Sequence, residues 1–150
     1  MTKSISPFPI PAKLPSGLTE VRNYWQHLKR RQNSMPFWDD ANLASLPKLA
    51  DHLMLIDVFE NPQRFRFNSV GRRIRKRYGN DLVHKFVDEI DEKAPIEYFT
   101  SQSSATIESG VPTYYRSTRR GAGYHRLLFP MWGNGRIEMM LGAVISATRT

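Results

Sequence analysis

The chain contains no cysteine among its 150 residues. This excludes disulfide bonds, zinc sites with cysteine ligands and thiolate nucleophiles, and it fits a reducing compartment. Long apolar segments are also missing. The longest, Met139–Ile145, is far shorter than the ~20 residues of a membrane-spanning helix, and the proline-rich N-terminal residues lack a signal-peptide core. We therefore expect a cytoplasmic protein.

Patterns typical of catalytic or metal sites are absent as well. The four histidines (His27, His52, His84 and His125) are spread singly, and no pair has metal-binding spacing. No nucleophile-elbow motif occurs, and Gly121-Ala122-Gly123 lies between expected strands, so it is no dinucleotide fingerprint. The acidic run at 88–92 is typical of a solvated loop. The sequence thus predicts no enzyme activity and no metal.

What the chain has in excess is positive charge. Its net charge of +8 falls entirely within residues 1–80. Val70, Ile74 and Tyr78 stand four residues apart, which predicts a short amphipathic helix that Gly79 ends. The rest of that helix is a basic surface of Arg72, Arg73, Arg75, Lys76 and Arg77. Three interpretations stay open: a solvated helix flank, non-specific contact with nucleic acid, or a surface for an acidic protein or lipid headgroup.

The N-terminal part divides into two segments. Residues 1–17, rich in proline, predict a flexible leader, and residues 18–150 predict a single domain. A helix is expected from Thr19 as N-cap, with Lys29, Arg30 and Arg31 near its end. Its apolar stripe needs a covering surface, either the outer face of the sheet or a second protomer, and we expect a homodimer that uses this helix. The stripe consists of Leu18, Val21, Trp25 and Leu28.

The remaining pattern predicts an α+β fold. A hairpin, short helical pieces, a helix from Pro95 to Ser109 and a three-stranded meander follow one another. Asn134-Gly135 between apolar runs is a strong hairpin signal. We expect one five-stranded antiparallel sheet with helices on one face and an additional N-terminal helix, the last strand being central beside the first. The expected strands are 53–59, 64–69, 112–118, 124–132 and 136–147.

The succession of motifs resembles a PAS domain. Residues 18–147 are similar to the compact, stand-alone PAS family of bacteria, found in alphaproteobacteria. The motifs that carry the resemblance are Tyr24-Trp25, Leu46-Pro47, Leu55–Val58, the segment FRFNSVGRRIRKRYGNDLVH (65–84) and RLLFPMW (126–132). It implies a PAS-like sheet enclosing a cavity. Haem is disfavoured because the expected long helix has no histidine, and cysteinyl-flavin chemistry is excluded.

By this resemblance the chain is a stand-alone sensory or regulatory module that binds a small molecule, a signalling protein, or both. It would carry no output domain and no catalytic activity, and no cofactor is predicted beyond an unidentified small ligand. The rival is a small basic protein that binds nucleic acid non-specifically through Arg72–Arg77. The expected ligand pocket is lined by Ile56, Val58, Phe67, Tyr78, Phe86, Phe99, Tyr115, Leu127, Phe129, Met139 and Leu141. These pocket residues could instead simply pack as core.

Overall fold

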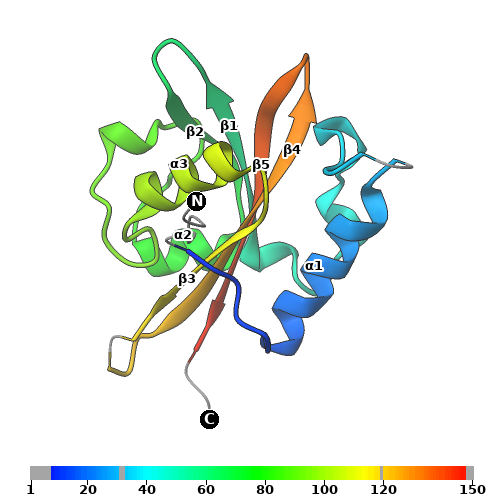
Figure 1. Ribbon diagram of the computed structural model, residues 1–150. Helices are drawn as coiled ribbons and strands as arrows, with labels where there is room; N and C mark the ends of the chain where they lie inside the picture. Colours follow the sequence, from blue (N-terminus) through cyan, green and yellow to red (C-terminus); the bar gives the residue numbers. More distant parts are fainter. Residues whose placement is uncertain (1–7, 31–32, 119, 148–150) are drawn as a thin grey trace, which may run out of the picture.

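A twisted five-stranded antiparallel sheet forms the centre of the molecule, with helices on both of its faces (Figure 1). The computed structural model describes residues 8–30, 33–118 and 120–147. The strand order is β2-β1-β5-β4-β3. The helices are α1 (Ser16–Leu28), α2 (Arg72–Tyr78) and α3 (Phe99–Ser109), with single 3-10 turns η1 (Trp38–Asp40), η2 (Leu43–Ser45), η3 (Ala50–His52) and η4 (Val87–Glu89). The strands are β1 (Leu53–Phe59), β2 (Arg64–Val70), β3 (Thr113–Ser117), β4 (Tyr124–Gly133) and β5 (Arg136–Ser146).

The strand prediction is confirmed in number, direction and order. The last strand, β5, is central and lies between β1 and β4, as expected. Asn134 and Gly135 join β4 to β5 with φ angles of 49° and 77°. Two positive φ angles in a two-residue loop match the twist of an antiparallel hairpin, which explains the Asn-Gly pair there.

Successive side chains along each strand point to opposite faces of the sheet, and two hydrophobic clusters result, one on each face. In β4, Tyr124 and Leu128 contribute to the cluster beneath α2 and α3. Leu127 and Phe129 point to the opposite face and join the cluster beneath α1. The core is thus divided by the sheet into two layers.

Helix α1 covers the sheet through its apolar stripe. Leu18, Val21 and Trp25 are buried in the cluster on that face, and Leu28 is half-buried. The indole Nε1 of Trp25 donates to the Pro130 carbonyl at 3.0 Å, which fixes the helix against β4. The sheet of the same chain therefore already covers this stripe. Homodimer formation stays a prediction, but the stripe no longer supports it.

The predicted start of α1 was wrong. The helix begins at Ser16, and Thr19 lies inside it, where its hydroxyl donates to the Pro15 carbonyl instead of capping. The helix also ends at Leu28, before the three basic residues expected in its last turn; of these, Arg31 lies outside the described residues. Residues 1–7 of the expected leader also lie outside the described residues. Residues 8–15 contact the domain: the Phe8 carbonyl accepts from β3, and Ile10 and Leu14 pack against the hydrophobic cluster that α1 covers.

Helix α3 begins four residues later than predicted. Tyr98 has a φ of 57°, a left-handed conformation that separates Pro95 from the helix. The Pro95 and Glu97 carbonyls accept hydrogen bonds from a side chain of β4 instead of from helical amides. Gly110, with a φ of 69°, ends α3 as expected.

None of the helices in the described part of the chain has both the length and the hydrophobicity needed to cross a bilayer.

Candidate functional site

The basic helix α2 docks on the sheet as the sequence predicts. Ile74 and Tyr78 are buried, together with Val70 at the end of β2. Gly79 ends the helix with a φ of 96°. The hydroxyl of Tyr78 donates to the Asp91 carbonyl at 2.7 Å, which ties the helix to the loop before α3. The amphipathic edge therefore fixes where the basic residues project.

The five basic residues of α2 are not equivalent. Arg73 and Lys76 are exposed, and no other described residue forms a hydrogen bond or ion pair with either head group. The other three contact the chain itself: Arg72 pairs with Asp51 at 3.2 Å, Arg75 donates to the Val70 carbonyl at 3.1 Å, and Arg77 donates to the Ala122 carbonyl. A solvated flank thus describes only part of this surface.

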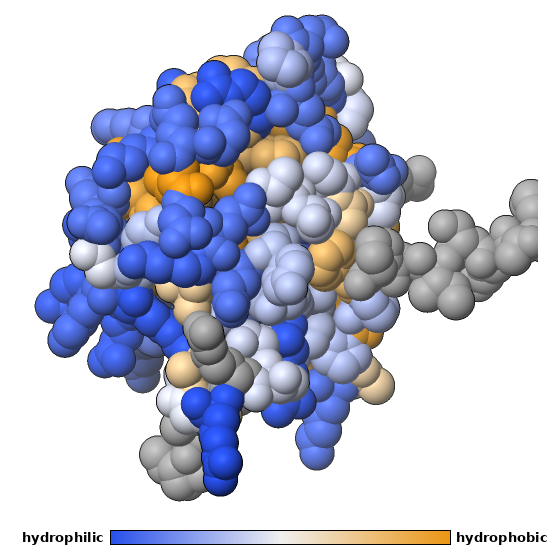
Figure 2. Space-filling model, turned by 90° about the vertical axis from the view of Figure 1, so that its left-hand side faces the viewer, coloured by the Kyte–Doolittle hydropathy of each residue, from blue (hydrophilic) through white to orange (hydrophobic). Residues whose placement is uncertain are grey.

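Arg73 and Lys76 border a groove between α2 and the end of β5, which we call the α2–β5 groove. Its volume is about 430 Å³, within the ~300–1,000 Å³ common for small-molecule sites. Figure 2 views the side of the molecule that carries α2 and α3, and hydrophilic residues cover most of it. The groove is lined by His52, Arg73, Ile74, Lys76, Arg77, Pro95, Val144 and Ser146.

A buried arginine lies behind the groove. Arg126 of β4 has no exposed surface, and its cross-strand neighbour on β5 is Val144. Its guanidinium donates to Gln102 Oε1 at 2.8 Å and to the carbonyls of Pro95 at 2.8 Å and Glu97 at 2.6 Å. Burial lowers the pKa of Arg126 to about 10, because the charged form loses its hydration.

Aromatic rings surround this guanidinium and extend towards α2. The guanidinium carbon of Arg126 lies 5.1 Å from the Phe99 ring centre and 4.8 Å from that of Tyr115. Arg77 lies 5.0 Å from the ring centre of Tyr124, whose hydroxyl donates to a Glu97 carboxylate oxygen at 3.0 Å. Burial raises the pKa of Tyr124, so this hydroxyl stays protonated at neutral pH.

The eleven residues expected to line one interior pocket do not share one space. Phe86 packs at the sheet edge, where Arg64 stacks on its ring at 3.7 Å. The other ten divide between the two faces of the sheet. Ile56, Val58, Phe67, Tyr78, Phe99 and Tyr115 belong to the cluster beneath α2 and α3, and Leu127, Phe129, Met139 and Leu141 belong to the cluster beneath α1.

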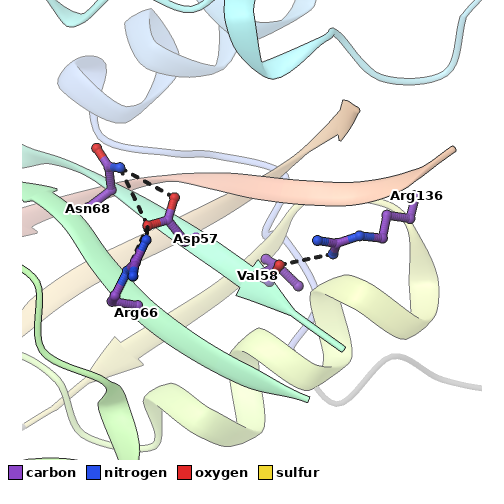
Figure 3. Close-up of polar contacts among 5 residues, drawn as sticks. All are labelled: Asp57, Val58, Arg66, Asn68 and Arg136. Atoms are coloured by element: carbon purple, nitrogen blue, oxygen red, sulfur yellow. Dashed lines mark hydrogen bonds and ion pairs between the residues drawn. The ribbon is translucent and has the colours of Figure 1, made fainter. Parts of the chain in front are cut away.

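A second polar cluster lies on the sheet where β1 and β2 pair. Asp57 accepts from Arg66 at 2.9 Å and from Asn68 at 3.3 Å (Figure 3). On the neighbouring strand, Arg136 donates to the Val58 carbonyl at 2.9 Å. These groups satisfy one another, so the cluster offers less free binding capacity than the α2–β5 groove.

The acidic loop run is used in local contacts. Asp88 forms a two-bond pair with Arg64, and Glu92 accepts from the amide and hydroxyl of Thr100. The Arg64 guanidinium holds the pKa of Asp88 below its usual range. Residues 8–30, 33–118 and 120–147 contain no group of three or more metal-binding side chains.

Sequence reasoning missed most of this site. Arg126 alternates with Tyr124 and Leu128 along one strand, and that parity could have placed it on the core face. Pro95 was expected in a helix, His52 was considered only as a metal ligand, and the groove residues Val144 and Ser146 were not singled out. They come from distant segments, so no local pattern brings them together.

Comparison with models of known protein families found no match, and comparison with curated protein sequences found none either. The resemblance to the PAS family therefore stays a prediction carried by the motifs alone.

Proposed function

We propose that this protein is a PAS-type sensory or regulatory module that binds a small molecule in the α2–β5 groove and has no catalytic activity. The observation that carries the proposal is the groove itself. It combines an apolar floor with the head groups of Arg73 and Lys76, which no other described residue engages, the composition typical of small-molecule sites.

The interior of the domain supports this location. PAS folds are expected to hold ligands between sheet and helices, but here Arg126, Phe99 and Phe67 occupy that layer. The Phe67 and Phe99 rings lie 5.6 Å apart, and Arg126 stacks on Phe99. The α2–β5 groove lies at the border of this layer and has a volume of about 430 Å³.

Native mass spectrometry of the full chain, purified without denaturation, tests the proposal. We expect a retained small molecule, seen as extra mass that is lost when the protein is denatured. Ser146→Phe, which fills the groove with a neutral side chain, should abolish retention. Thr118→Phe is the matched control, because Thr118 is also exposed but lies outside the groove. Wild-type protein that carries no added mass, or an unaffected Ser146→Phe variant, would contradict the proposal.

Regulation would act through a partner protein or through self-association. Light scattering of the full chain at high micromolar concentration distinguishes a homodimer from a monomer, and a strictly monomeric protein leaves a separate signalling protein as the partner.

A further inference from the structure

We infer that the α2–β5 groove selects an amphipathic organic anion, whose acidic headgroup binds Arg73 and Lys76 and whose apolar body lies on the groove floor. This inference rests on the proposed function, because it names the chemical class of the ligand in the same groove.

The headgroup position follows from the unpaired cations. Arg73 and Lys76 stand three residues apart on α2, so both side chains project from the same side of the helix. No described residue neutralises either of them, whereas Arg72 and Arg77 are engaged by Asp51 and Ala122. An Arg and a Lys together provide donors and charge for one carboxylate or phosphate group.

The apolar body follows from the floor. Ile74 and Val144 are 2% and 5% exposed, and Pro95 is buried beside them. The apolar surface that the groove exposes therefore also comes from the aliphatic stems of its basic residues, Arg73 and Lys76. A ligand with a hydrocarbon or aromatic part would cover this surface, whereas a bare inorganic anion would leave it in contact with water.

The buried Arg126, which lies behind the groove floor, also favours a negatively charged ligand. Arg126 donates to the Pro95 carbonyl and pairs with Val144 in the sheet, so it lies directly next to two floor residues. Gln102 Oε1 and two carbonyls, all neutral, accept its hydrogen bonds, the Glu97 carboxylate accepts from Tyr124, and the charge of Glu92 acts on Arg126 without a hydrogen bond. A buried cation without a hydrogen-bonded carboxylate favours negative charge nearby, because the protein interior screens it weakly.

A nucleic acid fits these observations less well. Polyanion binding is strongest where many solvated cations release counterions together. Here three of the five cations on α2 are held by the chain itself, and the two free ones face a groove with an apolar floor. This arrangement suits one small molecule.

A matched series of probes tests the inference: octanoate, octyl phosphate, octanol, acetate and inorganic phosphate. Each is titrated into the isotope-labelled full chain and followed by amide chemical shifts. We expect octanoate or octyl phosphate to bind at least tenfold more tightly than octanol, acetate or inorganic phosphate. The shifts should centre on Ile74, Val144 and Ser146. The stronger of the two octyl anions identifies the headgroup as carboxylate or phosphate.

Variants separate the headgroup contribution from general charge. Arg73→Gln with Lys76→Gln should weaken binding of the octyl anion at least tenfold and leave octanol unchanged. Lys13→Gln with Arg22→Gln removes the same charge from the α1 side and should have little effect. Equal binding of octanol and the octyl anions, shifts centred elsewhere, or no binding of any probe would overturn the inference. A neutral molecule retained in native mass spectrometry would also overturn it, while leaving the proposed function intact.

Discussion

The strongest prediction concerns the buried Arg126, which Arg126→Met tests. Methionine has similar length and keeps contact with Phe99, but it removes the guanidinium and its three hydrogen bonds of 2.6–2.8 Å. Gln102 Oε1 and the carbonyls of Pro95 and Glu97 would then stay buried without this donor. Each unsatisfied acceptor costs about 1–3 kcal/mol.

An opposing term reduces that sum. The buried cation itself carries a desolvation penalty of several kcal/mol, which the substitution removes. The acceptors that lose their donor are neutral, so leaving them buried without a hydrogen bond costs less free energy than burying an unpaired charge would. We expect a net decrease of about 2–4 kcal/mol in the free energy of unfolding, a large part of the ~5–15 kcal/mol typical of a whole domain.

Equilibrium unfolding in urea at pH 7, followed by tryptophan fluorescence, measures this difference. Arg116→Met is the matched control, because Arg116 is exposed on the neighbouring strand β3, and its effect should stay within about 0.5 kcal/mol. An Arg126→Met variant as stable as the wild type, or more stable, would refute the reasoning. It would mean that the desolvation penalty of the guanidinium exceeds the value of its hydrogen bonds.

Three further predictions concern other parts of the chain. Gly71→Ala should cost more than about 2 kcal/mol in urea unfolding, because its Cβ would overlap the η3 backbone. Gly142→Ala should cost less, because its Cβ would meet side-chain atoms of Met54 and Leu128 and no backbone atom. Burial lowers the pKa of His125 below its usual 6.5, so the unfolded chain binds the proton more readily. The contribution of His125 to the free energy of unfolding should therefore be fully present above pH 6.5 and be lost as the pH drops from 6.5 through its folded-state pKa. His125→Gln should flatten the dependence of the free energy of unfolding on pH in this range, and an unchanged dependence would contradict the prediction. Binding of DNA duplexes should be weak, indifferent to sequence and lost at about 150 mM salt or in Arg73→Gln with Lys76→Gln; tight, sequence-selective binding at that salt would favour the nucleic-acid alternative.

The sheet could be predicted from the sequence because its signals are local. Period-2 alternation marks β2, and the Asn134-Gly135 turn fixes the pairing of β4 with β5. Helix starts were harder to predict. Thr19 has the right chemistry for a cap, but α1 begins at Ser16, a turn earlier than this signal indicates. A capping preference of about 1 kcal/mol is easily outweighed by the burial of Leu18 and its neighbours.

The residues of the expected pocket divide between the two faces of the sheet for a different reason. Hydrophobicity identified residues that are indeed buried, but it could not say which face of the sheet each one occupies. Ile56 and Leu141, for example, lie on opposite faces, and only the register of β1 with β5 reveals this. The groove is harder still, because it joins η3, α2, the loop before α3 and β5.

Arg126 connects the fold to the proposed site. It satisfies the carbonyls of Pro95 and Glu97, and this accompanies the late start of α3 at Phe99. The same interaction holds Pro95 at the floor of the α2–β5 groove, beside Val144. A buried cation is costly, and its cost is lowest when its hydrogen bonds are complete and a negative charge is near. An anion in the groove would supply that charge, so ligand binding should stabilise the folded chain as well as occupy the groove. Octyl anions should therefore raise the thermal midpoint of the wild type more than that of Arg126→Met, and an equal rise in both would show that the buried arginine plays no part in binding.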